Sequence, residues 1–390
     1  MSVYPHQLER LSAVLEREGL AALVATTAAN VHYLTGFRSL IGRGSHAPCL
    51  AVFAPRGTAL VVPATDVPAI VADGIAVEHL VCFGELAARY AADGTAGSRV
   101  RSLIERGVAS PAEGLARALE ALGARGRIGL DEDALTQRAW QETVARLDAL
   151  TLVPAADLLR AARRVKGPYE IDCLARGLGI AEEAANAVIQ SLKPGMTESE
   201  AVVAYGTQVL KRGADLVVVS IAFGERTWIP APVPTDRPLR SGDLVRLDVG
   251  CIFKGYHARL ARMAVMGEPS ARQQAACDVV QAGLEAAVDA VAPGHTAGRV
   301  HDAGVAAVRA AGLEGFGGYR LGHGAGLEPC ESPELTAGDT TPLEPGEVLC
   351  VELPYFEIGW AGVHLRDTLL VTTRGRQVMN RSTRALVLLD

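Results

Sequence analysis

The spacing of apolar residues in the amino-terminal part of the chain switches repeatedly between helical and strand patterns. Residues 7–18 place Leu8, Leu11 and Leu15 three and four positions apart, the spacing of one buried helix face, and a glycine then ends the pattern. Short apolar runs of strand length follow at 21–26, 49–54, 59–62 and 127–131, with a helical stretch at 112–122. This alternation predicts an α/β domain over residues 1–158.

The second part of the chain combines long helical patterns with strands. Helices are expected at 170–192, 197–212 and 271–292. Between them, residues 244–250 alternate polar and apolar side chains in the period-2 manner of a half-buried strand, with Arg246 and Asp248 on one face. A return strand completes the expected hairpin. The pattern predicts a second domain over residues 159–390, and therefore a mixed α/β (α+β) chain of two domains.

Polar side chains recur at strand positions of the second domain. Asp248 and Arg259 lie on the two strands of the hairpin. His323 stands in the turn 322–326, where glycines allow the backbone to approach a ligand closely. Further polar positions on later strands are Glu352, His364 and Arg366. The last two are two residues apart and share one strand face. We expect these side chains to converge on one site.

This set of positions resembles that of the pita-bread metallopeptidases, the family of methionine aminopeptidase, aminopeptidase P, prolidase and the metal-free creatinase. The resemblance covers essentially the whole chain, and residues 30–37 resemble the N-x-x-Y-L-T-G-F signature of the family's amino-terminal domain. It implies a creatinase-like α/β domain followed by a pita-bread domain. In the peptidases five ligands hold two divalent ions, and Asp248, His323 and Glu352 match three of those ligands.

The two remaining ligand positions carry arginines. The family has an aspartate eleven residues after the first ligand and a glutamate in the last strand motif, and here these positions are Arg259 and Arg366. The resemblance implies that both family residues bridge the two ions, so their replacement removes the shared ligands. Two carboxylates, Asp248 and Glu352, then face two guanidiniums, which balances buried charge without an ion. We therefore predict no metal and no other cofactor.

Other family positions are altered as well. The proton-shuttling histidine of the peptidases falls on Ala231, and a second, substrate-contacting histidine falls on Cys330. The arginine that opens the last strand motif falls on His364, which we interpret as a replacement acid or base. Creatinase grips its substrate carboxylate across a dimer with an arginine that corresponds, allowing one gap, to Arg43. The resemblance thus implies a homodimer, and we predict Cys330 and Tyr256 as further substrate contacts.

The leading hypothesis is a metal-independent, creatinase-like enzyme that hydrolyses, or eliminates at, a C–N bond of a small carboxylate-bearing substrate. His323 would act as general base or acid, and Glu352 and Asp248 would orient it. Arg259 and Arg366 would bind the carboxylate or an oxyanion. One alternative is a non-catalytic pseudo-peptidase that binds a ligand or a protein. Another is a mononuclear metal Xaa-Pro-type hydrolase that keeps the three family ligands, although two guanidiniums would repel its ion.

Composition and charge narrow the classes of function that the chain could have. The chain has 390 residues, of which 49% are hydrophobic and 21% charged, as is ordinary for a globular enzyme. Its formal charge of -6 gives no electrostatic footprint for nucleic acid, and no apolar stretch reaches membrane-spanning length. The 7 cysteines are dispersed without CxxC pairs, which argues against a disulfide framework. We expect a cytoplasmic protein with a small-molecule substrate and no nucleic-acid or membrane partner.

Overall fold

The computed structural model describes residues 4–40, 48–90 and 94–390, and the chain divides into two compact units. The first unit ends at Arg163 and the second begins at Arg164. The sequence pattern placed this boundary after residue 158. The segment that spans the predicted boundary is helical, because Ala156–Arg164 forms helix α7.

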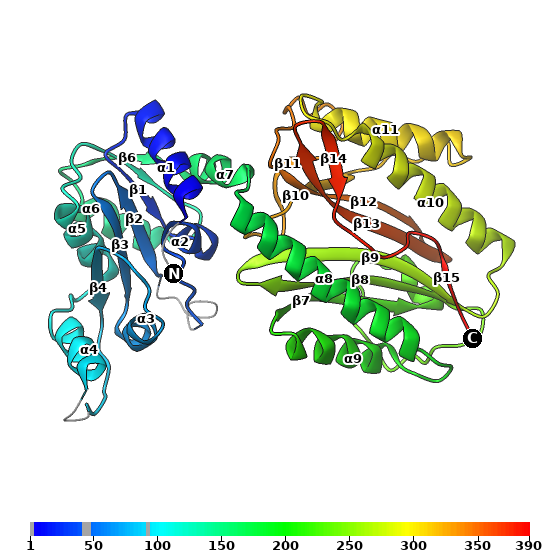
Figure 1. The fold of residues 1–390 in the computed structure, drawn as a ribbon, viewed down its shortest axis with the longest axis horizontal. Coiled ribbons are helices and arrows are strands. Elements are labelled where there is room, and N and C mark those ends of the chain that lie inside the picture. Colours follow the sequence, from blue (N-terminus) through cyan, green and yellow to red (C-terminus); the bar gives the residue numbers. More distant parts are fainter. Residues whose placement is uncertain (1–3, 41–47, 91–93) are drawn as a thin grey trace. The chain divides into compact units, whose positions relative to one another are not determined.

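The first unit is a six-stranded sheet with helices around it (Figure 1). Its strand order is β4-β3-β2-β1-β5-β6. The strands are β1 (Ala22–Ala25), β2 (Leu50–Ala54), β3 (Gly57–Pro63), β4 (His79–Phe83), β5 (Arg127–Leu130) and β6 (Thr151–Pro154). The helices before α7 are α1 (Pro5–Glu18), α2 (Ala28–Thr35), η1 (Ala64–Asp66), α3 (Val67–Ala72), α4 (Thr95–Glu105), α5 (Pro111–Ala121) and α6 (Gln137–Arg146). The predicted α/β domain is confirmed.

The second unit is built on a nine-stranded sheet. Its main path has the order β11-β10-β12-β13-β9-β8-β7, with β14 beside β13 and β15 beside β9. The strands are β7 (Asp215–Phe223), β8 (Leu244–Phe253), β9 (Tyr256–Met266), β10 (Gly322–Gly324), β11 (Glu331–Glu334), β12 (Val348–Glu357), β13 (Ala361–Thr372), β14 (Gly375–Val378) and β15 (Val387–Leu389). The helices are α8 (Pro168–Ser191), α9 (Glu198–Lys211), η2 (Gly224–Trp228), α10 (Ala271–Ala290) and α11 (Ala297–Ala310). None of the helices in the described ranges is long and apolar enough to cross a membrane.

One half of this sheet packs against α8 and α9, which lie together beside β7, β8 and β9 in Figure 1. Val245, Leu247 and Val249 of β8 are fully buried in a cluster with Leu178 of α8 and Tyr205 of α9. These three β8 residues are the apolar set of the alternating pattern. Their burial against the helices therefore fixes which face of β8 is left for the polar residues.

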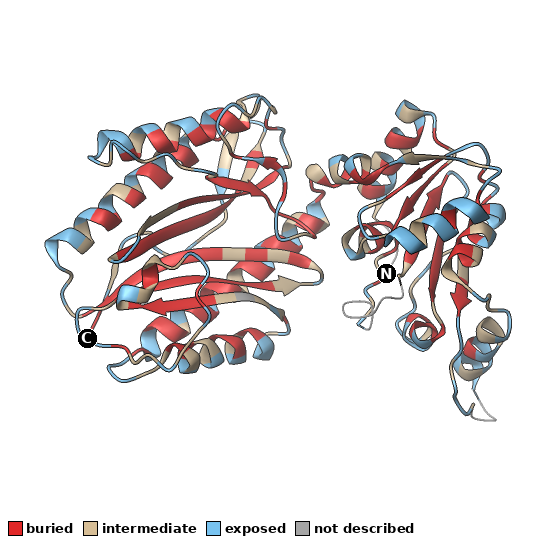
Figure 2. Ribbon diagram, turned by 180° about the vertical axis from the view of Figure 1, so that it is seen from behind, coloured by how far each residue is buried: buried red, intermediate tan, exposed pale blue. Residues whose placement is uncertain are grey.

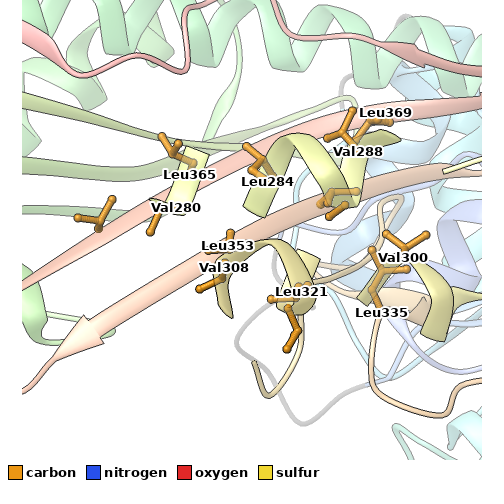
Figure 3. Close-up of a cluster of buried hydrophobic side chains, with 14 of the residues drawn as sticks. Val280, Leu284, Val288, Val300, Val308, Leu321, Leu335, Leu353, Leu365 and Leu369 are labelled. Atoms are coloured by element: carbon orange, nitrogen blue, oxygen red, sulfur yellow. The ribbon is translucent and has the colours of Figure 1, made fainter. Parts of the chain in front are cut away.

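The other half packs against α10 and α11 (Figure 3). Leu353 of β12 and Leu365 of β13 join Leu284 of α10 and Val308 of α11 in one buried cluster. Gly283 permits this close approach, because a Cβ on it would lie 2.4 Å from Val308 and 2.5 Å from Leu353. The apolar residues of β12 and β13 are thereby committed to the helix side of the sheet.

The face of the sheet opposite α8–α11, here called the inner face, receives the remaining side chains. Strand side chains alternate between faces, so Arg246 and Asp248 of β8 point away from the helices, as do His364 and Arg366 of β13. The strands of the second unit are coloured as buried along most of their length in Figure 2. Arg246, Asp248, His364 and Arg366 are all buried. Charged groups buried at this depth need partners, and their pairing defines the candidate site.

Candidate functional site

Strand register brings the two predicted carboxylates onto one row of the inner face. Asp248 on β8 lies opposite Ala261 on β9, Ala261 lies opposite Arg366 on β13, and Arg366 lies opposite Glu352 on β12. Asp248 and Glu352 are each 6% exposed, and Arg366 is 3% exposed. The methyl side chain of Ala261 leaves space for the long Arg366 side chain to reach across β9. One row thus carries an acid, an arginine and a second acid.

Arg366 joins the two carboxylates directly. Its Nη1 donates to Asp248 Oδ1, while its Nη2 and Nε donate to Glu352 Oε2, the Nε bond being 3.0 Å long. Arg259 on β9 adds contacts of 3.1 Å from Nη2 to both oxygens of Asp248. Burial opposes ionisation, but Arg366 outweighs it and holds the pKa of Asp248 and of Glu352 below the usual range. Two carboxylates and two guanidiniums therefore stay charged together.

Two buried histidines adjoin Glu352. His364 Nε2 lies 3.0 Å from Glu352 Oε2, and His323 Nδ1 lies 2.9 Å from the carbonyl oxygen of Gly324. These oxygens can only accept, so the bonded ring nitrogens carry the protons of the neutral imidazoles. The other two nitrogens, His364 Nδ1 and His323 Nε2, keep lone pairs and have no hydrogen-bond partner among the described residues. Burial lowers the pKa of both rings, and each is a candidate base.

Glycines place His323 between its neighbouring strands. A Cβ on Gly322 would lie 2.1 Å from the carbonyl oxygen of Cys350, and one on Gly324 would lie 2.3 Å from that of Ser332. Gly322 also has a φ of 142°, which side chains other than hydrogen rarely tolerate. Strand β10 can pack between β11 and β12 because these positions lack side chains, so the glycine-rich turn is a steric requirement for the position of His323.

A cavity of about 770 Å³ opens beside Glu352. One wall is the glycine-rich loop 312–320, and the other wall contains Pro354, Tyr355 and Phe356 of β12. Arg320 belongs to the loop and pairs with Glu334 at 3.2 Å. Glu352 lines the cavity and also belongs to the buried cluster. A molecule bound in this cavity would therefore meet the cluster at Glu352.

Arg246 is a further buried residue of this face that the sequence pattern placed beside Asp248 but to which it assigned no role. Arg246 is fully buried, and its Nη2 donates to the carbonyl oxygens of Ile229 at 2.5 Å and Pro230 at 3.2 Å. Its guanidinium carbon lies 4.9 Å from the ring centre of Phe356. Nε and Nη1 have no hydrogen-bond partner within the described ranges. Burial lowers the pKa of Arg246 to about 10, so it is still a cation at neutral pH.

Residues 172–373 match the model of the family described as Metallopeptidase family M24, and residues 7–165 match the Creatinase/Prolidase N-terminal domain. The chain belongs to metallopeptidase family M24. The predicted resemblance to the pita-bread peptidases is thereby confirmed, together with the two-part fold.

Relatives of this M24 protein are named as peptidases. It is 30% identical to the "Probable dipeptidase PepE" of Mycobacterium tuberculosis, over 99% of this chain and 96% of the relative. It is 27% identical to the "Uncharacterized peptidase YqhT" of Bacillus subtilis, over 98% of this chain and 100% of the relative. The solved Xaa-Pro dipeptidase from Bacillus anthracis superposes with a TM-score of 0.83 at 23% identity, covering 98% of this chain and 99% of that chain. These names support a hydrolytic role at the level of the family.

The metal-ligand positions of the family fit two divalent ions poorly in this M24 protein. Arg259 and Arg366 occupy two of the five positions, and their N–H groups already bond Asp248 and Glu352. Across the described part of the chain, no three His, Cys, Asp or Glu side chains are grouped so that they could hold a metal ion. The donor set is therefore short of ligands and rich in cations.

Three predicted substrate contacts of the M24 protein lie outside the cluster or outside the residues that the structure describes. The hydroxyl of Tyr256 donates to Glu170 Oε1 of α8 at 3.1 Å, so this side chain packs on the helix side of β9 and does not reach the inner face. Cys330 is exposed, and its Sγ lies 4.0 Å from Nη2 of Arg320 near the cavity. Arg43 lies outside the described residues. The roles given to the residues of the cluster remain predictions.

Proposed function

We propose that this M24 protein is a metal-independent hydrolase that cleaves a C–N bond of a small carboxylate-bearing substrate. The position of Arg366 carries the proposal, because this guanidinium donates to both Asp248 and Glu352 where family enzymes are expected to hold cations. Each pair of like unit charges 4 Å apart repels by about 4 kcal/mol at the effective dielectric of a protein surface, and a dication doubles that. An ion added beside Arg366 would meet this repulsion.

His323 is the proposed general base. Its Nε2 lone pair would take a proton from water as the water oxygen attacks the carbon of the scissile C–N bond. The proton would then pass from Nε2 to the leaving nitrogen as that bond breaks. His364, held by Glu352, would accept a hydrogen bond from a substrate N–H through Nδ1, and the carboxylates would stabilise positive charge on the substrate. An elimination would use the same base to remove a C–H proton.

The relatives favour a second candidate, a metal-dependent dipeptidase. Proteins named "Probable dipeptidase PepE" and "Xaa-Pro dipeptidase" match this chain over 99% and 59% of its length. In such an enzyme Asp248, His323 and Glu352 would hold the ion, and both arginines would have to leave these carboxylates. Arg366 would then need a new arrangement of its buried side chain, which is the reason we rank this candidate second.

Metal content separates the two candidates. The untagged protein is purified without chelator, and Mn, Fe, Co and Zn per chain are measured by elemental mass spectrometry before and after loading with each ion. Guanidino acids, amino-acid amides and Xaa-Pro dipeptides are then tested for turnover with and without EDTA. We expect less than roughly a tenth of an equivalent of metal, and turnover that EDTA leaves unchanged. A firmly bound ion together with EDTA-sensitive cleavage of a dipeptide would overturn the proposal.

A double variant provides the matched control for this measurement. Arg259→Asp combined with Arg366→Glu restores carboxylates at the two positions where the family resemblance places them. We expect this variant to bind about two equivalents of Mn²⁺ under the loading conditions that leave the wild type empty. Binding by the variant shows that the loading conditions are adequate, so that a lack of metal in the wild type reflects its arginines.

We further propose a cytoplasmic homodimer that acts on a small molecule, without a nucleic-acid or membrane partner. The family resemblance supports the dimer, and the formal charge of -6 gives no attraction to nucleic acid. Sedimentation equilibrium tests the dimer, since one chain has a mass of 40.9 kDa. A mass of one chain at all concentrations would exclude it.

A further inference from the structure

We propose that Arg246 is the residue that binds the carboxylate of the substrate. The leading hypothesis gave this role to Arg259 and Arg366, and the creatinase resemblance gave it to Arg43. The described bonds of Arg259 and Arg366 are instead directed to carboxylates of the protein, and Arg43 lies outside the described residues. The class of substrate in this inference is taken from the proposed function. The choice of Arg246 as the binding residue rests on the contacts of its own side chain.

The charge balance of the inner face leaves one cation without a counter-ion. Asp248 pairs with Arg259 and Arg366, and Glu352 pairs with Arg366. Both neighbouring histidine rings have a lowered pKa and are neutral at pH 7. Arg246 takes part in no ion pair with any residue that the structure describes. Three guanidiniums therefore share two carboxylates, and one bound anion would bring the face to neutrality.

Hydrogen-bond capacity leads to the same residue. All three nitrogens of the Arg366 guanidinium already donate to Asp248 or Glu352. In Arg246 only Nη2 is bonded, whereas Nε and Nη1 lack partners in the described part of the chain and together carry three N–H groups. Buried donors are almost always satisfied in folded proteins, so a fully buried guanidinium with unmatched donors calls for a partner from outside. A carboxylate supplies strong acceptors for such donors.

Arg246 also lies next to the space that a ligand would occupy. Its guanidinium stacks on Phe356, which lines the cavity beside Glu352 and makes an edge contact with His364 at 6.3 Å between ring centres. Arg246 therefore contacts a residue of the cavity wall. Arg246 and Asp248 are two strand residues apart, about 7 Å between Cα atoms. The substrate should therefore be of amino-acid size, with its carboxylate a few bonds from the cleaved C–N bond.

The test compares the wild type with Arg246→Met and Arg246→Lys. Arg272→Met is the matched control, because Arg272 also stacks on an aromatic ring, 4.1 Å from Trp360, but its side chain is 57% exposed. Isothermal titration calorimetry measures binding of N-acetylglycine, a small carboxylate, and of N-acetylglycinamide, its neutral counterpart. Circular dichroism and thermal unfolding check that each variant is folded.

We expect the wild type and Arg272→Met to bind N-acetylglycine saturably and to show no measurable binding of N-acetylglycinamide. Arg246→Met should bind the acid at least about 10-fold more weakly, and Arg246→Lys should fall between them because it keeps the charge but has fewer directed donors. Equal affinity in Arg246→Met and the wild type would overturn the inference. So would a wild type that shows no acid-specific binding up to roughly 50 mM, a concentration that detects even millimolar affinity. If Arg246→Met does not fold, the same criterion applies to Arg246→Lys.

Failure of this inference is distinguishable from failure of the proposed function. A metal-bound, EDTA-sensitive enzyme would overturn the function, yet the affinity ratio between the wild type and Arg246→Met would still report on the carboxylate contact. Conversely, an unchanged affinity in Arg246→Met would leave the metal content and the turnover of the wild type as they are.

Discussion

Two neighbouring residues of β13 enter buried ion pairs of different kinds. Asp367 points to the helix side of the sheet, where Arg262 Nη2 bonds it at 2.8 Å and Arg384 Nε bonds it at 2.6 Å. Arg262 places its remaining nitrogens on two backbone carbonyls and on Ser382 Oγ. Arg366 points to the inner face, where each of its three nitrogens makes a hydrogen bond but several nitrogens of the surrounding residues make none.

The two ion pairs differ in how completely the polar groups around them are matched. Around Asp367 the donors of Arg262 all have partners, so the pair is complete within the protein. On the inner face, Arg246, Arg259, His323 and His364 each keep a buried nitrogen without a partner among the described residues. Unmatched polar groups cost stability, and a fold keeps them where function needs them. Buried arginine and carboxylate therefore form a pair with matched donors on one face and a cluster with unmatched nitrogens on the other.

The largest effect should come from breaking the complete pair. Arg262→Met should lower the free energy of unfolding by about 3–5 kcal/mol, because it leaves buried acceptors and a carboxylate with fewer partners. Arg246→Met should change the unfolding free energy by only about 1 kcal/mol, since it removes unmatched donors along with two backbone contacts. Urea unfolding with unchanged m-values measures both. Equal losses of unfolding free energy in the two variants would mean that Arg246 on the inner face contributes as much to stability as Arg262 on the helix side of the sheet.

The second prediction tests whether the inner face carries catalysis. His323→Ala should lower kcat/KM for the substrate found in the turnover screen by about 10²- to 10³-fold, because it removes the proposed base. His295→Ala is the control, since His295 is a half-buried histidine whose Nδ1 is bonded to the Ala290 carbonyl oxygen. Steady-state kinetics measures kcat/KM for both variants and for the wild type. A His323→Ala enzyme with the wild-type rate would exclude His323 as the base.

The smallest effect is the pH dependence of stability. His323 and His364 have a pKa below the ordinary 6.5 in the folded state, so the unfolded chain binds their protons first as pH falls. The free energy of unfolding should therefore decline below about pH 6.5, with each histidine contributing at most about 1.4 kcal/mol per pH unit. Asp248 and Glu352, whose folded pKa values are lowered, add stability above their ordinary values of 3.8 and 4.5 and lose it only as pH falls below these.

Urea midpoints measured between pH 8 and pH 4 check this order. In His364→Ala the decline just below pH 6.5 should be shallower than in the wild type, while the loss at lower pH should persist. A wild-type stability that stays constant from pH 7 to pH 5 would contradict the buried, neutral state of these histidines. The measurement needs no substrate, so it tests the inner face independently of turnover.

The fold of the chain was largely predictable. The alternation in 244–250 placed Val245, Leu247 and Val249 on one face of a strand, and the structure buries that face against α8 and α9. The predicted helix 271–292 is observed as Ala271–Ala290. These features depend on local periodicity and on burial of one face, both of which the order of residues carries directly.

The contacts of the site were only partly predictable. Family motifs identified Asp248, Glu352 and Arg366, but no motif indicated that Arg366 would use all of its nitrogens on these two carboxylates. Arg246 could be placed on the correct face, yet its lack of partners depends on residues far away in the chain. Tyr256 was predicted to contact substrate and instead bonds Glu170, because strand alternation turns it toward α8.

The order of residues by itself determined the two-part M24 fold, the identity of the polar positions on β8, β9, β12 and β13, and the presence of arginines where carboxylates are expected. Tertiary structure alone decided which cation pairs with which anion. Hydrogen bonds and charge balance depend on side chains that meet across strands, such as Asp248 and Arg366 from β8 and β13. Their partners are set by register and reach, and these exist only after the sheet has formed.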